Sequence, residues 1–445
     1  MKEDKLMRKK GWLKSAAAVA TSVVMMATAG MTPVMAEVNT FAGVAQDGRY
    51  YTDYTTLEDA QAAAAQLAIQ IASEGDVLLK NANHALPLRG NERISIFGVG
   101  QDALAGSTTS DVLLADALEA EGFQVNKSLR QYYEKIGTTF GVEDMAFDRG
   151  VENSYGLYGD VAIVVLSRGG GEGSDMPTVT GEEADEKDLA SHSGYVAQAD
   201  GKVYKHFLQL TDSEEALLDY VKAQGFKKII YLVNSSEIFE MADLQNDDAI
   251  DGILWIGRPG QTGTIGAARI LSGAVNPSGK TVDTWYADFT ADPIWQNSIG
   301  NQQVGSDVTY TVAGQATDTV TTEAAGIGGT ATAYHGVDYE EGIYVGYRYY
   351  ETVAADKEAA QAGAGKEGYD KAVVYPFGYG LSYTDFQYSN LVVKAGNEVI
   401  SDGAVLDAAK LSSSVETGRA QIETMTVQVD VTNSGSVAGK ETVEI

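Results

Sequence analysis

Uninterrupted runs of apolar residues alternate with amphipathic stretches in the first part of the chain. The run at residues 161–166 is apolar at every position, as expected for a strand buried on both faces of a parallel sheet. Strands are predicted at 94–97, 123–125, 161–166, 228–234 and 250–256, and helices at 57–72, 112–121, 212–224 and 264–271. Strands that alternate with helices predict an α/β domain whose mostly parallel sheet is sandwiched by helices.

The ends of these elements also carry local signals. Thr211 or Asp212 is expected to cap the helix at 212–224, and Gly225 to stop it. Ligands of parallel sheets bind outside the carboxyl ends of the strands. The segments expected on that rim are 98–111, 167–175, 234–236 and 257–263.

The pattern changes in the last third of the chain. Residues 297–336 are rich in Gly, Thr and Ala and are predicted to form a mobile or weakly ordered surface insertion, and 354–368 a second, smaller one. From residue 386 the alternation becomes that of strands, which predicts an incomplete β-sandwich of the fibronectin-III or Ig type. Because the chain stops at Ile445 inside a predicted strand, we expect it to be truncated.

The N-terminal 36 residues have the pattern of a signal peptide: a basic front, an apolar run at 16–29 and small residues before Glu37. A retained membrane anchor is the alternative, but the run is short for a span of about 20 residues. The predicted organisation is a signal peptide at 1–36, a linker and helix at 37–72, the α/β domain at 73–385 and the partial sandwich at 386–445. We expect a secreted or cell-surface, extracytoplasmic bacterial protein, with no membrane association after cleavage.

Composition narrows the classes of partner. The 445 residues carry a formal charge of −30, which argues against nucleic acid and anionic membranes and suits a neutral ligand such as a sugar. The chain has no cysteine, and its four histidines are scattered, so no metal site is predicted. Gly98-Val99-Gly100 lacks the third glycine of a dinucleotide fingerprint, and no cofactor is predicted.

The most promising chemistry lies in the glycine-rich segment after the apolar run at 161–166. Three glycines precede Glu172, which leaves the backbone free to approach a ligand closely. A glycosidase needs one carboxyl group to protonate the leaving oxygen and a second to attack or assist. Glu172 fits the first role, whereas Asp111, Asp175 and Asp307 are only weak candidates for the second. The alternative is an ordinary solvated loop, and the acids that follow are interpreted in that way: Glu182, Glu183, Asp185, Glu186 and Asp188.

Aromatic residues cluster densely between residues 344 and 383. They are Tyr344, Tyr347, Tyr349, Tyr350, Tyr375, Phe377, Tyr379 and Tyr383. Aromatic faces can stack on sugar rings or pack in a domain interface, and we favour packing.

Several segments together, in this order, resemble glycoside hydrolase family 3, specifically its C-terminal α/β domain and the fibronectin-III-like domain after it. The segments are 74–81, 86–88, 97–101, 110–111, 257–261, 275–280, 344–350, 375–383, 431–435 and 438–441. The resemblance covers about residues 72–445, and its most specific parts are 257–261 followed by 275–280, and 344–350 followed by 375–383.

The resemblance implies that Glu172, within Gly171-Glu172-Gly173, is the general acid/base. Ser110, Asp111, Arg168 and Asp175 are the candidates for binding substrate. Met176 stands where the family usually has an arginine, which puts the local charge pairing in question. The expected substrate is a β-linked glucoside or oligosaccharide, because the N-acetylglucosaminidase branch of the family uses a different acid/base arrangement.

The same resemblance implies that a part of the enzyme is absent. The family's nucleophile is an aspartate on a (β/α)8 barrel, which normally precedes this domain. We expect a circularly rearranged member whose barrel follows residue 445 in the same polypeptide. The predicted function is part of a retaining β-glucosidase acting on terminal β-D-glucosyl residues. A β-xylosidase, a non-catalytic carbohydrate-binding module and a cell-envelope scaffold are the alternatives.

Overall fold

The computed structural model describes the central part of the chain and shorter segments towards its C-terminus. The described residues are 53–101, 112–136, 143, 145–169, 179–192, 200–297, 324–325, 331–332, 341–356, 365–395, 398–399, 401–402, 405–406 and 425–444. The chain divides into two units, residues 1–62 and 63–445. In the first unit, the described residues include the beginning of helix α2 (Leu57–Gly75). The predicted signal peptide lies outside the described residues.

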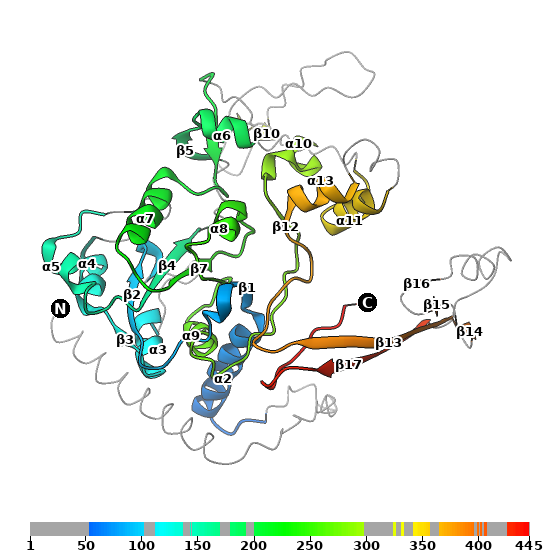
Figure 1. The fold of residues 1–445 in the computed structure, drawn as a ribbon, viewed down its shortest axis with the longest axis horizontal. Helices are drawn as coiled ribbons and strands as arrows, with labels where there is room; N and C mark the ends of the chain where they lie inside the picture. The colour runs from blue at the N-terminus through cyan, green and yellow to red at the C-terminus, as the bar shows by residue number, and fades with distance from the viewer. Residues whose placement is uncertain are drawn as a thin grey trace. The chain divides into compact units, whose positions relative to one another are not determined.

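A six-stranded sheet forms the centre of the larger unit (Figure 1). Its order is β1 (Val77–Asn81), β8 (Gly252–Trp255), β7 (Ile229–Asn234), β4 (Val161–Ser167), β2 (Arg93–Phe97) and β3 (Gln124–Val125). Strand β1 runs antiparallel to β8, and the other neighbours are parallel. The predicted mostly parallel sheet is thus confirmed, whereas the antiparallel edge strand was not predicted.

Both faces of the sheet are buried, as the apolar run in β4 requires. Alternate residues of β4 enter different cores: Ala162, Val164 and Leu166 one, and Val161, Ile163 and Val165 the other. Apolar residues of α4, α7 and α8 pack in the first core, and those of α3 and α9 in the second. The helices are α3 (Leu114–Ala120), α4 (Lys127–Ile136), α5 (Arg149–Ser154), α6 (Glu186–Ser191), α7 (Asp212–Ala223), α8 (Ala242–Asn246) and α9 (Thr264–Ser272).

Helix α7 shows how local sequence sets an element's ends. Thr211 is its N-cap, and Thr211 and Glu214 form a reciprocal capping box. Gly225, which follows the C-cap, has a φ of +76°, a value that favours glycine. The predicted start and stop of this helix are therefore confirmed.

Smaller elements lie outside the central sheet. Three short helices follow, α10 (Pro293–Asn297), α11 (Tyr347–Ala355) and α13 (Gly365–Ala372), and single 3-10 turns are η1 (Ala82–His84), η2 (Val99–Gln101) and η3 (Phe289–Ala291). The paired strands are β5 (Val179–Glu183) with β6 (Tyr204–His206), β9 (Trp285–Tyr286) with β12 (Val373–Tyr375), β10 (Ala324–Ala325) with β11 (Ala331–Thr332), and β15 (Ser401–Asp402) with β16 (Val405–Leu406). The described part of the insertion predicted at 297–336 consists of strands β10 and β11 and of Asn297, the last residue of α10.

The C-terminal strands fit the start of a sandwich. Strand β13 (Phe386–Ala395) pairs antiparallel with both β14 (Glu398–Val399) and β17 (Met425–Asn433). This arrangement is consistent with the predicted partial sandwich, while its fibronectin-III type remains a prediction. No helix among the described residues is long and apolar enough to cross a bilayer.

The aromatic cluster divides into packed and exposed members. The hydroxyls of Tyr375, Tyr379 and Tyr383 donate to Gln245 Oε1 and to the carbonyls of Leu79 and Ile270, respectively, and Tyr350 donates to Asp292. These four tyrosines pack within the predicted α/β domain, and their place in a domain interface stays a prediction. By contrast, Tyr344 and Tyr347 are 48% and 43% exposed, and the Tyr347 and Phe377 rings lie 4.7 Å apart at their centres.

Candidate functional site

The carboxyl ends of β2, β4 and β7 meet at one edge of the sheet, and the candidate loops leave from this edge. The register pairs Phe97 with Val164 and Ser167 with Asn234. Gly98 has a φ of +105°, and a Cβ at this position would lie 2.4 Å from the carbonyl oxygen of Val165. Only glycine allows this close approach. The backbones of β2 and β4 are therefore tightly packed where β2 ends.

Arg168 is the predicted site residue that falls in the described part of the chain. Glu172, Ser110, Asp111 and Asp175 lie outside the described residues, and so does Asp307. The segment that carries Glu172 can nevertheless be characterised by its flanks. It starts after Gly169, which follows β4, and it ends at Val179, the first residue of β5.

The Arg168 guanidinium is fully buried, and all five of its N–H groups find acceptors within the protein. Its Nη1 and Nη2 donate to the two carboxylate oxygens of Glu214, the latter over 2.6 Å. The remaining N–H groups donate to the backbone carbonyls of Ser167, Phe207 and Gln209 at 3.0–3.1 Å. The Phe207 and Phe239 rings have their centres 5.4 and 4.8 Å from the guanidinium carbon.

This geometry favours a structural part for Arg168. Its side chain is 0% exposed, and Glu214 balances its charge with two charge-assisted bonds. The predicted contact of Arg168 with substrate gains no support, since its donors are already used inside the fold. Instead, Arg168 ties the end of β4 to the turn at 207–209. The residue that sequence reasoning missed is Glu214, whose capping-box pattern was the available signal.

The far flank of the Glu172 loop is tied to the same turn. Strand β5 pairs antiparallel with β6, with Val179 opposite His206 and Glu183 opposite Tyr204. Because β6 leads directly into the turn that Arg168 holds, both ends of the loop are anchored to one another through the residues around His206. The structure therefore fixes the base of the loop on both sides.

The acids after the loop are not all solvated. Asp185 caps α6, and Glu183 is exposed and pairs with Lys202. The prediction of a solvated side chain is wrong for Asp188, which is buried and accepts a 3.0 Å hydrogen bond from the Asp185 backbone N–H. Its carboxylate also lies 3.8 Å from Lys205 Nζ, and such partners make its burial tolerable.

Glu143 is a further acid at this edge. Its carboxylate accepts hydrogen bonds of 3.3 and 3.1 Å from the backbone N–H of Val99. Burial is the main cause that raises the pKa of Glu143 to about 7, and the negative charge of Glu214 adds to it. A carboxyl group beside the loop after β2 thus titrates near neutral pH, which sequence reasoning did not predict.

A second buried polar cluster consists of His192, His206 and Glu240. His192 Nε2 lies 2.7 Å from Glu240 Oε2, and His206 Nε2 lies 2.9 Å from Glu240 Oε1. Burial alone lowers the pKa of His192, but the Glu240 carboxylate outweighs it and raises the pKa to about 9. These three residues are far apart in the sequence and follow no metal-binding spacing, so no sequence signal announced their meeting.

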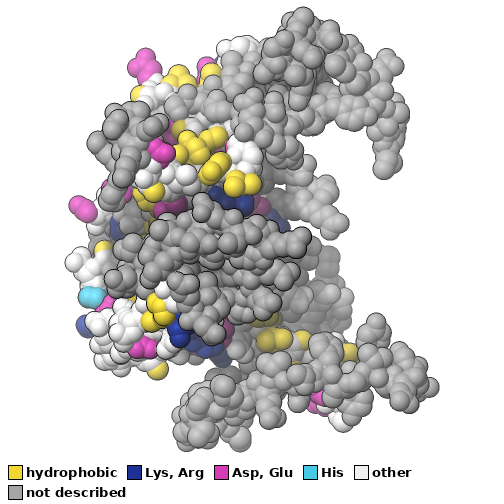
Figure 2. Space-filling view, turned by 90° about the vertical axis from the view of Figure 1, so that its right-hand side faces the viewer, with side chains coloured by type: hydrophobic (Ala, Val, Ile, Leu, Met, Phe, Trp, Pro, Cys, Tyr) yellow, Lys and Arg dark blue, Asp and Glu magenta, His cyan; other side chains and the backbone are white. Residues whose placement is uncertain are grey.

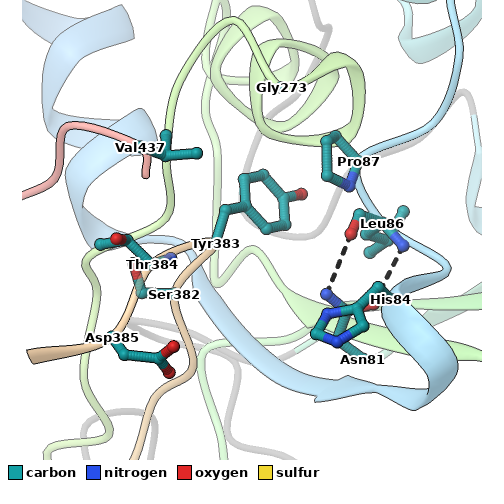
Figure 3. Close-up of a pocket in the computed structure, with 10 residues that line it drawn as sticks. All are labelled: Asn81, His84, Leu86, Pro87, Gly273, Ser382, Tyr383, Thr384, Asp385 and Val437. Atoms are coloured by element: carbon teal, nitrogen blue, oxygen red, sulfur yellow. Dashed lines mark hydrogen bonds between the residues drawn. The ribbon is translucent and has the colours of Figure 1, made fainter. Parts of the chain in front are cut away.

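A pocket lies at the opposite edge of the sheet. Figure 3 shows the side chains that line it. It is lined by Asn81, His84, Leu86, Pro87, Gly273, Ser382, Tyr383, Thr384, Asp385 and Val437. Asn81 ends the antiparallel strand β1 and pairs with Gly252 at the start of β8, so this edge holds the amino ends of the parallel strands. The Asn81 amide exchanges two hydrogen bonds with the Leu86 backbone, at 3.0 and 2.9 Å. The pocket is thus separate from the predicted site.

The charge balance of the chain disfavours an anionic ligand. On the face in Figure 2, acidic side chains are interspersed with apolar and basic ones over the described residues. The acids outnumber the basic residues by 62 to 32 in the whole chain.

Comparisons with known proteins place these features in a family. Residues 76–347 match the family described as "Glycosyl hydrolase family 3 C-terminal domain". "Beta-glucosidase A" of Butyrivibrio fibrisolvens is 30% identical over 405 residues, which are 85% of this chain and 41% of that protein. "Probable beta-D-xylosidase 6" of Arabidopsis thaliana is 27% identical over 237 residues, 51% of this chain and 26% of that protein.

A solved structure agrees with the sequence comparison. The structure of beta-glucosidase 3B from Thermotoga neapolitana in complex with glycerol is similar with a TM-score of 0.56 and 25% sequence identity. The match covers 87% of this chain and 44% of that one. This chain therefore spans less than half the length of each of these relatives.

Proposed function

This chain belongs to glycosyl hydrolase family 3, and from that premise we propose that it supplies the acid/base and part of the sugar pocket of a retaining β-glucosidase. The observation that carries the proposal is the anchoring of the Glu172 loop. The loop leaves the end of the central strand β4, where Arg168 is locked by Glu214, and returns into β5, which pairs with β6. A loop fixed at both ends suits a residue that must meet a glycosidic oxygen within hydrogen-bonding reach.

The proposed chemistry divides between this chain and a barrel in the same polypeptide. Glu172 protonates the glycosidic oxygen as the bond breaks, and a barrel aspartate attacks the sugar to form a covalent glycosyl-enzyme. Glu172 then takes a proton from the water that releases the sugar. The relatives' greater length supports a missing domain, because the chain covers 41% of "Beta-glucosidase A".

Replacing Glu172 tests the acid/base assignment in the polypeptide that includes the barrel. We expect Glu172→Gln to lower kcat on an aryl β-glucoside by about 100-fold or more, because the amide cannot transfer the proton. Azide should restore part of the turnover by attacking the glycosyl-enzyme without a general base. Unchanged turnover in Glu172→Gln would remove the assignment.

Glu183→Gln is the matched control for this test. Glu183 lies on β5, which follows the Glu172 loop, but its side chain is 55% exposed and pairs with Lys202 at the surface. We expect this variant to keep the wild-type turnover. The isolated 445-residue chain should release no product above background, and hydrolysis at an enzyme-like rate by that chain would contradict the divided site.

A β-xylosidase is the second candidate function. The similarity to "Probable beta-D-xylosidase 6" over 51% of this chain favours keeping it. The two sugars differ by the hydroxymethyl group at C5, so kcat/KM for the aryl β-glucoside and the aryl β-xyloside separates the candidates. We expect the glucoside to be preferred.

A further inference from the structure

The cluster of His192, His206 and Glu240 brings three metal-binding side chains together from three parts of the fold. His192 follows α6, His206 ends β6, and Glu240 lies between β7 and α8. One ligand atom of each residue lies within 4.8 Å of those of the other two. All three side chains are at most 9% exposed, so the group is largely shielded from bulk water.

We propose that His192, His206 and Glu240 form a binding site for one divalent transition-metal ion of the zinc class. Two imidazole nitrogens and one carboxylate are a common ligand set for zinc, with water as the fourth ligand. Magnesium and calcium prefer sites built from oxygen atoms, so this set disfavours them. The proposal is independent of the function assigned to Glu172.

The spacing of the ligand atoms suits this ion after a small adjustment. Zinc bonds of about 2.0–2.1 Å in a tetrahedral site separate neighbouring ligand atoms by about 3.3 Å. The two nitrogen-to-oxygen distances in the cluster are 2.7 and 2.9 Å. The Glu240 carboxylate therefore has to withdraw by about half an ångström from each ring. The ligand atoms, which lie within 4.8 Å of one another, have to come to a separation of about 3.3 Å.

The surroundings orient the ligands as an outer shell does in metal sites. His192 Nδ1 lies 2.9 Å from the carbonyl oxygen of Asp188, which directs Nε2 towards Glu240. The Phe289 backbone N–H donates to Glu240 Oε1 over 2.5 Å. The His206 ring packs against Phe289 and Trp295, whose ring centres lie 6.0 and 5.5 Å away. These contacts hold the ligands in place before an ion arrives.

A hydrogen-bonded cluster without an ion is the competing interpretation. His206 Nδ1 accepts a hydrogen bond of 3.3 Å from the Leu208 backbone N–H, which leaves the ring proton on Nε2, directed at Glu240. An ion has to displace this proton and break the hydrogen bond that it makes to Glu240. The two interpretations therefore differ in whether zinc competes with protons for the same nitrogen atoms.

Metal titration of the full chain distinguishes them. After dialysis against EDTA, isothermal titration with Zn²⁺ at about pH 7.5 should show one site with micromolar or tighter affinity, and Mg²⁺ at the same concentration should show none. Zinc should also raise the melting temperature, because it binds the folded chain. The affinity should fall as the pH is lowered, because protons compete with zinc for the imidazole nitrogens.

Substitutions assign the site to these residues. His192→Gln and Glu240→Gln should each weaken zinc binding by at least about 100-fold, because each removes one ligand. His84→Gln is the matched control, since His84 is exposed and lies in the pocket at the other edge, and it should leave the affinity unchanged. His192 lies at a helix end, and circular dichroism checks that its variant is folded.

The outcomes are decisive in both directions. Loss of zinc binding in folded His192→Gln, with binding kept in His84→Gln, supports the site. No zinc binding to the wild-type chain, or equal binding in the wild type and both ligand variants, overturns the proposal and leaves the hydrogen-bonded cluster.

Discussion

Two buried polar clusters hold the turn at 206–209, and they do so in different ways. Arg168 and Glu214 form a closed pair in which every guanidinium N–H is used and neither side chain is more than 4% exposed. His192, His206 and Glu240 form a more open group, 9% exposed at His192 and Glu240, in which the polar contacts depend on protons that can leave. The pair of Arg168 and Glu214 has no group left to bind a ligand, whereas the histidines of the second cluster can exchange a ring proton for a zinc ion.

Breaking the closed pair should have the largest effect. Glu214→Gln leaves Arg168 buried without a counter-charge, and we expect a loss of about 3–5 kcal/mol in the free energy of unfolding. Urea denaturation measures it. Asp219→Asn is the control, because this carboxylate is on the same helix but 79% exposed, and its cost should stay within about 0.5 kcal/mol. Equal losses in the two variants would show that the closed pair contributes nothing special.

Neutralising the open cluster should cost less. In EDTA, Glu240→Gln weakens the hydrogen bonds to two histidines and to the Phe289 N–H, and we expect a loss of about 2–3 kcal/mol. Glu237→Gln is the matched control, because Glu237 pairs with Arg258 over 3.4 Å at a partly exposed position and should cost less than about 1 kcal/mol. A loss at Glu240 as large as that at Glu214 would erase the difference between the clusters.

Glu143, which lies near the pair of Arg168 and Glu214, should make the free energy of unfolding depend on pH, with a smaller effect than the two changes above. Its pKa is raised from the ordinary 4.5 to about 7 in the folded chain, so folding favours the protonated form. Stability from this group is present below pH 4.5 and is lost as the pH rises through 7. The free energy of unfolding of Glu143→Gln should therefore rise relative to that of the wild type as the pH increases from about 5 to about 8. After allowance for the partial exposure of Glu143 to solvent, we expect this relative gain to be about 1–2 kcal/mol.

Urea denaturation at both pH values checks this prediction. The amide that Glu143→Gln introduces can still accept the Val99 N–H, so the change isolates the charge from the hydrogen bond. A constant difference between the variant and the wild type across this range would contradict the raised pKa.

The central sheet was predictable because its signal is local. The apolar run in β4, the cap at Thr211 and the stop at Gly225 each identify an element from a few neighbouring residues. Strand β1 was not predicted, since its five residues carry no sequence signal for the direction of the strand or for its partner. The pair β5 and β6 was missed as well, because it forms between segments that are far from adjacent in the sequence.

The candidate acid/base, Glu172, was identified from the sequence alone. It lies in a glycine-rich segment after a predicted buried strand, and this segment resembles one in family 3. The family and the α/β fold followed in the same way, because apolar runs and motif order are written in contiguous residues. Only the tertiary structure decided that Arg168 is closed off by Glu214, that Asp188 is buried, and that His192 and His206 share Glu240. Such contacts depend on which segments of the chain pack together in the fold. Packing brings their side chains within hydrogen-bonding distance, but the residues have no regular spacing in the sequence by which the contact could be predicted.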